Sequence, residues 1–362
     1  MGHLSMSNKS ILALLLLSPL AAACDLNPSQ PLSATMWSPL ANMPVREILI
    51  SNNVQLDVPA APGVIRLTQS DNQQLIAELS SWPTDSGQVG SIRAQPAVLD
   101  QDYDGIADAL YAVDEYGLVW YLPLNNTGFN TPQLLADFTE LQAQFRQPVQ
   151  LVQSVAADAG FAGQRQTMLL LIASTADAGD ILIMLKHRQG EETPVDISKL
   201  VDRSELSAGE LQTGISDANW LQLQQSGGWY VKTQRSISAK PAVYAGVVYF
   251  TSAEVSQLNA DCSLGASAQP QLHALHLHHA GAVYVKRQWQ VIQPDAAELS
   301  LQQNAQGELE VLLQNEHQQQ LVLTELLAVD AACASCVKPL PAHSFPKVKR
   351  LATFQYEEGA HE

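Results

Sequence analysis

The sequence predicts an all-β fold, because short apolar runs alternate with turn residues along nearly the whole chain. The runs are rich in Val, Ile, Leu and Tyr, and Gly, Asn, Asp and Pro residues separate them. We expect strands over residues 47–50, 63–67, 74–79, 117–122, 168–173, 180–186, 242–251, 272–277, 281–286, 308–314 and 320–327. The one helix that the spacing predicts covers 132–145, where Leu134, Leu135, Phe138 and Leu141 share a face.

A weak internal repeat predicts how the strands are arranged. A Pro-Ala-Val triplet, a turn and a hydrophobic strand occur at 96–98 and again at 241–243. This rhythm is typical of β-propeller blades, which are four-stranded sheets of roughly 40–50 residues that pack on their neighbours. We expect a propeller of about six or seven four-stranded blades over residues 46–362, with two stacked β-sandwiches as the alternative. The tryptophans predicted to pack between blades are Trp82, Trp120, Trp220, Trp229 and Trp289.

The N-terminus predicts export from the cytoplasm. Lys9, an apolar run over 11–17 and small residues up to Ala23 form a signal peptide over 1–23, too short to span a bilayer. Cys24 follows directly, as in a bacterial lipobox, so its sulfur is predicted to carry lipid; ordinary cleavage that leaves an unmodified cysteine is the alternative. Residues 24–45, rich in Pro, Ser and Asn, read as a flexible tether. We expect a membrane-anchored lipoprotein of the bacterial envelope that faces the periplasm, with the cell surface as an alternative location.

The composition excludes several classes of function. Nineteen basic residues against 36 acidic ones, a net charge of −17, argue against a nucleic-acid partner, which needs clustered Lys and Arg. Only 15% of the residues are charged and 46% are hydrophobic, which allows a sizeable core. The chain contains no GxSxG, HExxH, P-loop or GxGxxG motif. It also lacks the adjacent cysteine pair common in quinoprotein dehydrogenases. We therefore expect no enzymatic activity and no small-molecule substrate.

The stretch 100–108, Asp-Gln-Asp-Tyr-Asp-Gly-Ile-Ala-Asp, predicts a Ca²⁺ site. Carboxylates at loop positions 1, 3, 5 and 9, a backbone carbonyl at position 7 and a glycine at position 6 suit a chain that wraps a hard cation. The predicted ligands are the side chains of Asp100, Asp102, Asp104 and Asp108 and the carbonyl of Ile106. Position 12 is Tyr111 rather than Glu, and a strand follows, so the loop is not an EF-hand.

Cysteines and histidines offer weaker candidates. Cys333 and Cys336 have CxxC spacing, which in an oxidising compartment favours a local disulfide; pairing of Cys262 with one of the two is the alternative. His276 and His278 would share a face of a strand and could form half of a metal site. Because no acidic or cysteine partner lies nearby in sequence, we expect no metal there, with His278 and His279 exposed in the turn that ends the strand. Asp114, Glu115 and Tyr116 are expected to form a solvated hairpin turn.

Two segments resemble the C-terminal β-propeller of the PilC/PilY family, factors of type IV pilus biogenesis. The first, 98–120, has the DxDxDGxxD loop, then Tyr-Ala-x-Asp and Gly-x-x-Trp. The second has Gly-Trp-Tyr at 228–230, a strand pair at 240–251, Cys262 and a Leu-x-Ala-Leu strand at 272–275. The resemblance covers about half of the chain after residue 23, and the family's N-terminal adhesin region has no counterpart in these 362 residues.

The resemblance implies a role and partners. It implies calcium binding by the 100–108 loop and a function in type IV pilus assembly, pilus dynamics or pilus-mediated cell adhesion. The implied partners are minor pilins or the pilus assembly machinery, and the implied location includes the pilus itself. The alternative, of a different class, is an envelope scaffold that uses its propeller to bind proteins unrelated to pili.

Overall fold

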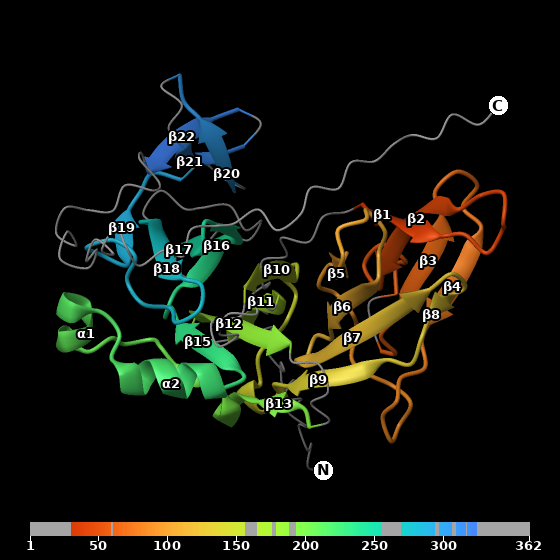
Figure 1. Cartoon of the computed structure of the whole chain (residues 1–362), viewed down its shortest axis with the longest axis horizontal. Helices are drawn as coiled ribbons and strands as arrows, with labels where there is room; N and C mark the ends of the chain where they lie inside the picture. The colour runs from red at the N-terminus through yellow and green to blue at the C-terminus, as the bar shows by residue number, and fades with distance from the viewer. Residues whose placement is uncertain are drawn as a thin grey trace, which may run out of the picture.

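The computed structural model describes residues 30–58, 61–155, 165–175, 179–187, 193–254, 269–293, 297–305, 309–315 and 317–323. The strands of five sheets account for about half of these residues, far more than the helices do, so the all-β class is confirmed. The sheets follow one another in chain order along an arc, from the right of Figure 1 to its upper left. The predicted number of six or seven blades stays a prediction, because it depends on residues beyond those described.

The first two sheets hold the N-terminal half of the fold. The strands of the first sheet, in spatial order, are β1 (Leu32–Trp37), β2 (Val45–Asn52), β3 (Ile65–Gln69) and β4 (Leu75–Leu79). The second runs β13 (Val195–Asp196), β9 (Gln133–Asp137), β7 (Leu118–Asn125), β6 (Ala109–Val113) and β5 (Ala97–Leu99), with β8 (Gly128–Phe129) on β7. Neighbouring strands of these sheets are antiparallel except β13 and β9, which are parallel.

The other three sheets complete the described fold. The third is β10 (Gln150–Val155), β11 (Arg165–Thr175), β12 (Gly179–His187), β15 (Gly228–Lys232) and β14 (Val201–Asp202). The fourth is β16 (Ser236–Tyr244), β17 (Val247–Ala253), β18 (Gln271–His276) and β19 (Gln288–Gln290). The fifth is β20 (Glu298–Gln303), β21 (Leu309–Gln314) and β22 (Gln319–Leu323). No helix among the described residues is long and apolar enough to cross a membrane.

The hydrophobic core lies between sheets, in four clusters. One cluster joins the first and second sheets and contains Trp82 and Trp120, whose ring centroids are 5.1 Å apart. The other three clusters lie between the second and third sheets, between the third and fourth sheets, and between the fourth and fifth sheets. Trp229 is fully buried between the third and fourth sheets, as predicted. Trp220 and Trp289 are only half-buried, and Trp220 lies on a helix.

Four predicted elements are wrong. The single strand predicted over 242–251 is two strands, because β16 ends at Tyr244 and β17 begins at Val247 after a turn. Residues 132–145 form β9 and the short 3₁₀ helix η1 (Thr139–Leu141) instead of one α-helix, because β7 offers a free edge and pairs Leu118 with Asp137. The predicted tether over 24–45 contains β1, whose every residue pairs with β2. The predicted strand over 281–286 is only an isolated bridge between Leu275 and Ala282. The chain bulges there before β19 pairs Gln288 with His273, and Val283 and Val285 are exposed.

Two helices were not predicted from the sequence. They are α1 (Ala208–Thr213) and α2 (Asp217–Gln225), inserted between β14 and β15 of the third sheet; in Figure 1, α2 lies below β15 and α1 lies at the left edge. The Ser207 hydroxyl accepts the Glu210 N–H at the start of α1, and the Ser216 hydroxyl accepts the Asn219 N–H at the start of α2. Of the α2 side chains only Leu223 is buried, so this helix carries almost no apolar stripe.

Candidate functional site

The acidic loop at 100–108 connects β5 to β6 and is fixed at its C-terminal end. The Ala107 N–H donates to the Thr35 carbonyl of β1 at 2.8 Å, and the Asp108 N–H donates to the Leu99 carbonyl at 2.8 Å. The Asp108 carbonyl accepts the Leu124 N–H of β7 at 2.8 Å. Ile106 is buried, and residues 100–105 are half-buried or exposed. The loop therefore presents its acidic part to solvent while its end is held by two sheets.

Three of the four predicted carboxylates converge. Oxygens of Asp100, Asp102 and Asp108 all lie within 4.8 Å of one another, and no other group of this kind exists in the described ranges. The fourth, Asp104, lies outside the group, and its Oδ1 accepts the Ile106 N–H at 2.8 Å. Three carboxylates at this spacing repel one another, and a hard cation with oxygen ligands would remove that repulsion.

The backbone also orients the carboxylates. The Gly105 N–H donates to Asp100 Oδ2 at 2.8 Å, and the Gln101 N–H donates to Asp108 Oδ2 at 2.6 Å. Gly105 has a φ of 85°, a backbone conformation that glycine adopts without the steric cost that a Cβ would add. This explains why glycine stands at the sixth position of the loop. The loop therefore holds its acidic side chains with backbone N–H groups, and a bound Ca²⁺ would complete rather than create this shape.

A residue of the third sheet contacts the loop and was missed by sequence reasoning. Arg165, the first residue of β11, donates from Nη1 to the Gln101 carbonyl at 3.2 Å, and its guanidinium carbon lies 4.4 Å from the Tyr103 ring centroid. Arg165 is 64 positions from Gln101, so no local motif could reveal the contact. On the other side of the loop, burial first and the charge of Asp108 second raise the pKa of Tyr121.

The turn after β6 is confirmed, but only part of it is solvated, since Tyr116 is exposed and Asp114 is buried. Asp114 is 1% exposed, and its carboxylate accepts the N–H groups of Gly90, Tyr116, Gly117 and Leu118. Burial raises the pKa of Asp114, and these four backbone donors act in the opposite direction. Asp114 thus fixes a turn and joins it to the segment before β5, which is a structural role and no sign of catalysis.

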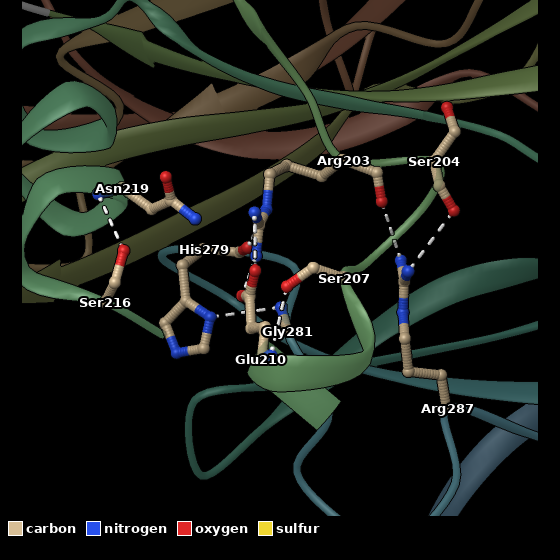
Figure 2. Close-up of polar contacts among 9 residues, drawn as sticks. All are labelled: Arg203, Ser204, Ser207, Glu210, Ser216, Asn219, His279, Gly281 and Arg287. Carbon is tan, nitrogen blue, oxygen red and sulfur yellow. Dashed lines mark hydrogen bonds and ion pairs between the residues drawn. The ribbon is translucent and has the colours of Figure 1, made fainter. Parts of the chain in front are cut away.

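A second polar cluster joins α1 to the turn after β18. Figure 2 shows Arg203 paired with Glu210 of α1, and both side chains are 6% exposed. Arg203 Nε also donates to the His279 carbonyl at 2.9 Å. Arg287 donates to the carbonyls of Arg203 and Ser204, at 3.1 and 3.3 Å. Burial, and next the charge of Arg203, lower the pKa of Arg287 to about 10.

His278 and His279 lie in the turn after β18, as expected, but they are half-buried rather than exposed. His273 is 6% exposed, stacks on Phe250 and hydrogen-bonds with Ser252 at 2.7 Å. The rings of His276 and His279 are half-buried and stack at 3.9 Å. Burial is the main cause that lowers the pKa of His276 to about 4 and those of His273 and His279 to about 3.

Their hydrogen bonds disfavour a metal role. The Nδ1 atoms of His276 and His279 accept the N–H groups of His278 and Gly281, at 3.2 and 3.0 Å. A neutral imidazole that accepts at Nδ1 carries its proton at Nε2, so neither nitrogen has a lone pair left for a metal. His279 instead packs against α2, where its ring meets the Trp220 ring edge-on.

The remaining predicted sites lie outside the described residues. These are the signal peptide over 1–23, the lipidation site Cys24 and the cysteines Cys262, Cys333 and Cys336. The lipid anchor and the disulfide therefore stay predictions.

Comparisons with known proteins identify the fold. No protein-family model matches the chain, and no match is found among curated proteins. Among solved structures, the Pseudomonas aeruginosa PilY1 C-terminal domain matches with a TM-score of 0.53 and 13% identity, over 81% of this chain and 71% of that one. The Myceliophteria thermophila Cps50 (Swd1) β-propeller domain matches with a TM-score of 0.33 and 8% identity, over 82% of this chain and 72% of that one. A quinohemoprotein alcohol dehydrogenase from Comamonas testosteroni matches with a TM-score of 0.36 and 11% identity, over 73% of this chain and 49% of that one.

The likeness to the PilY1 domain concerns the fold alone. The described sheets, packed one on the next around inter-sheet cores, form a β-propeller, so the predicted fold class is confirmed. Two stacked sandwiches would not give five sheets joined in sequence by four separate clusters.

Proposed function

We propose that the chain is a non-enzymatic, calcium-binding β-propeller lipoprotein of the bacterial envelope that supports type IV pilus assembly, pilus dynamics or pilus-mediated adhesion. One observation carries the proposal. In a propeller similar in fold to the PilY1 C-terminal domain, the DxDxDGxxD loop brings the carboxylates of Asp100, Asp102 and Asp108 within 4.8 Å of one another. The same loop, in the same order relative to the following strand and tryptophan, carries the sequence resemblance to the PilC/PilY family.

The residues present fit a calcium ion. Ca²⁺ takes six to eight oxygen ligands at roughly 2.3–2.6 Å, and the loop offers four carboxylates and its backbone carbonyls. Asp100, Asp102 and Asp108 would hold the ion first, and Asp104 would join them by exchanging its bond to the Ile106 N–H for the metal. The Ile106 carbonyl would supply a further ligand. Bound calcium would neutralise the acidic loop and stiffen it.

The stiffened loop would shape a surface for protein partners. Its end is bonded to Thr35 of β1, and Arg165 of β11 contacts its beginning, so the loop lies where three sheets meet. Minor pilins or the pilus assembly machinery are the partners that the family resemblance suggests. The lipid at Cys24 would hold the protein at the membrane, and the net charge of −17 makes nucleic acid an unsuitable partner.

Calorimetric titration with Ca²⁺ tests the site. Native protein should bind one ion and gain melting temperature, while a variant with Asp100→Ala and Asp104→Ala should do neither. A variant with Asp71→Ala and Asp85→Ala loses the same charge outside the loop and should bind as the native protein does. Equal binding by the loop variant would show that the site is assigned wrongly.

Deleting the gene tests the biological role. Loss of surface pili or of twitching, restored by the native gene and not by the loop variant, is the expected result. Normal piliation and twitching in the deletion strain would refute the pilus role and favour a scaffold for other envelope proteins. Co-purification from native membranes would then identify those proteins.

A further inference from the structure

The hairpin between β1 and β2 exposes an unusual set of apolar side chains. Its outer end, residues 37–45, is called the tip here, and it has the sequence Trp-Ser-Pro-Leu-Ala-Asn-Met-Pro-Val. Trp37 is 50% exposed, Leu40 57%, Met43 53% and Val45 43%. Trp37 and Val45 are paired across the two strands, and Leu40 and Met43 lie in the turn between them. Four large apolar side chains therefore project from one short, ordered turn.

Three backbone donors of the tip are satisfied within the tip itself. The Ser38 N–H donates to the Pro44 carbonyl at 3.0 Å, the Met43 N–H to the Leu40 carbonyl at 3.1 Å, and the Leu40 N–H to the Ser38 hydroxyl at 3.2 Å. Pro39 and Pro44 have no N–H to satisfy. An exposed backbone donor is costly in hydrocarbon, so internal hydrogen bonding is what a segment that enters lipid requires.

The tip also differs from the rest of the chain in charge. None of its nine residues is charged, whereas 15% of the whole chain is charged and the net charge is −17. An acidic surface is repelled by anionic lipid and strongly hydrated, so only an uncharged projection could enter the bilayer. Tryptophan is moreover the side chain that bilayer interfaces favour, because its ring is apolar and its N–H is polar.

We propose that the tip inserts into the interfacial layer of a lipid bilayer, with Trp37, Leu40 and Met43 as the inserting side chains. The place of the tip in the chain agrees with this. The predicted acylated Cys24 precedes Leu32 by only eight positions, a span of at most about 30 Å when extended. The tip therefore lies within reach of the membrane that an acyl group on Cys24 would enter. A lipid on a short linker leaves the protein free to turn, and insertion of the tip would fix which face of the propeller points away from the bilayer.

Vesicle flotation tests the proposal without the acyl group. The chain from residue 24 onward, with Cys24→Ser, keeps every described residue and removes the acylation site. It is mixed with vesicles of phosphatidylcholine alone and of phosphatidylcholine with phosphatidylglycerol. The tip variant carries Trp37→Ser, Leu40→Ser and Met43→Ser. The control variant carries Leu75→Ser, Leu211→Ser and Leu221→Ser, at residues 53%, 52% and 52% exposed elsewhere.

The expected result is binding to neutral vesicles that depends on the tip. The partition coefficient should fall by at least about tenfold in the tip variant and by much less in the control, since apolar area entering lipid drives interfacial binding. Anionic lipid should not strengthen binding. Brominated lipids should quench the tryptophan fluorescence of the native protein more than that of the Trp37→Phe variant. That variant should still bind the vesicles. Circular dichroism and melting temperature confirm that each variant is folded.

Several outcomes would overturn the proposal. Native protein that stays with the soluble fraction, or a tip variant that floats as well as the native protein, would show that the tip does not insert. A dimer that forms in the native protein and not in the tip variant, without vesicle binding, would assign the tip to a contact between copies of the chain. Binding that requires phosphatidylglycerol would show an electrostatic contact elsewhere.

Discussion

Asp102→Asn should stabilise the protein without calcium and weaken its response to calcium. Asp102 is exposed, and among the described residues its side chain accepts only the Asp104 N–H, at 3.3 Å, which an asparagine oxygen can also accept. The substitution therefore removes a charge and changes little else. In the absence of a cation this charge repels those of Asp100 and Asp108, so its loss should raise stability.

The size of the effect follows from the spacing of the oxygens. Two unit charges 4.8 Å apart repel by about 0.9 kcal/mol in bulk water, and Asp102 takes part in two such pairs. The gain is therefore about 2 kcal/mol at low ionic strength and about half of that at 0.15 M salt. Unfolding of roughly 300 residues has an entropy of about 0.6 kcal/mol/K, so the melting temperature should rise by about 3 °C at low salt.

Differential scanning calorimetry in a chelator and in Ca²⁺ measures both effects. At a calcium concentration of about 100 times Kd, binding stabilises the native protein by about 2.7 kcal/mol, a rise of about 4 °C. The melting temperature of Asp102→Asn should rise by clearly less on addition of Ca²⁺, because the variant has lost a charged ligand. Asp85→Asn, an exposed carboxylate outside the loop, controls for net charge. A lower melting temperature for Asp102→Asn in chelator, or an undiminished calcium shift, would refute the reasoning.

Three further predictions concern stability. Glu210→Ala should cost about 3–5 kcal/mol in urea unfolding, because it leaves the buried Arg203 charge without its partner; a cost no larger than that of the cap variant Ser207→Ala would contradict this. Gly228→Ala should prevent accumulation of folded protein, because its Cβ would overlap the Met184 carbonyl at a φ of 143°; soluble protein with native circular dichroism would show that β15 can shift. The free energy of unfolding should fall as the pH drops from about 6.5 toward 4, because the unfolded chain protonates buried histidines that the fold keeps neutral. Each such histidine contributes a slope of up to about 1.4 kcal/mol per pH unit. Chemical unfolding of His276→Asn should show a shallower dependence of this free energy on pH than the native protein does.

Local patterns predicted the strands and the acidic loop, because both depend on residues close in sequence. Alternation of apolar residues and turn residues specified β2, β3, β4, β7, β11, β12 and β18, and the loop spacing specified three converging carboxylates. Asp104 lies apart from the other three carboxylates, and its Oδ1 accepts the Ile106 N–H. Loop spacing alone does not predict which of the four carboxylates converge in the absence of an ion.

Elements without an apolar pattern, or with contacts distant in sequence, could not be predicted in this way. The helices α1 and α2 are mostly polar, and their only local signals are the capping residues Ser207 and Ser216. The apolar spacing at 132–145 fits a helix as well as a strand followed by a turn, and only the free edge of β7 decides between them. Arg165 reaches the loop from another sheet, and its role depends on tertiary packing.

The inter-sheet position of the hydrophobic cores limits how this chain can change over evolutionary time. Since each cluster is lined by two successive sheets, a larger side chain on one sheet can be accommodated only by a smaller one on the next. Compensating substitutions should therefore arise in pairs separated by roughly the length of one blade. Covariation in related sequences would accordingly be strongest between blades and weak within each one, whereas a sandwich-like protein with one shared interior would show no such interval.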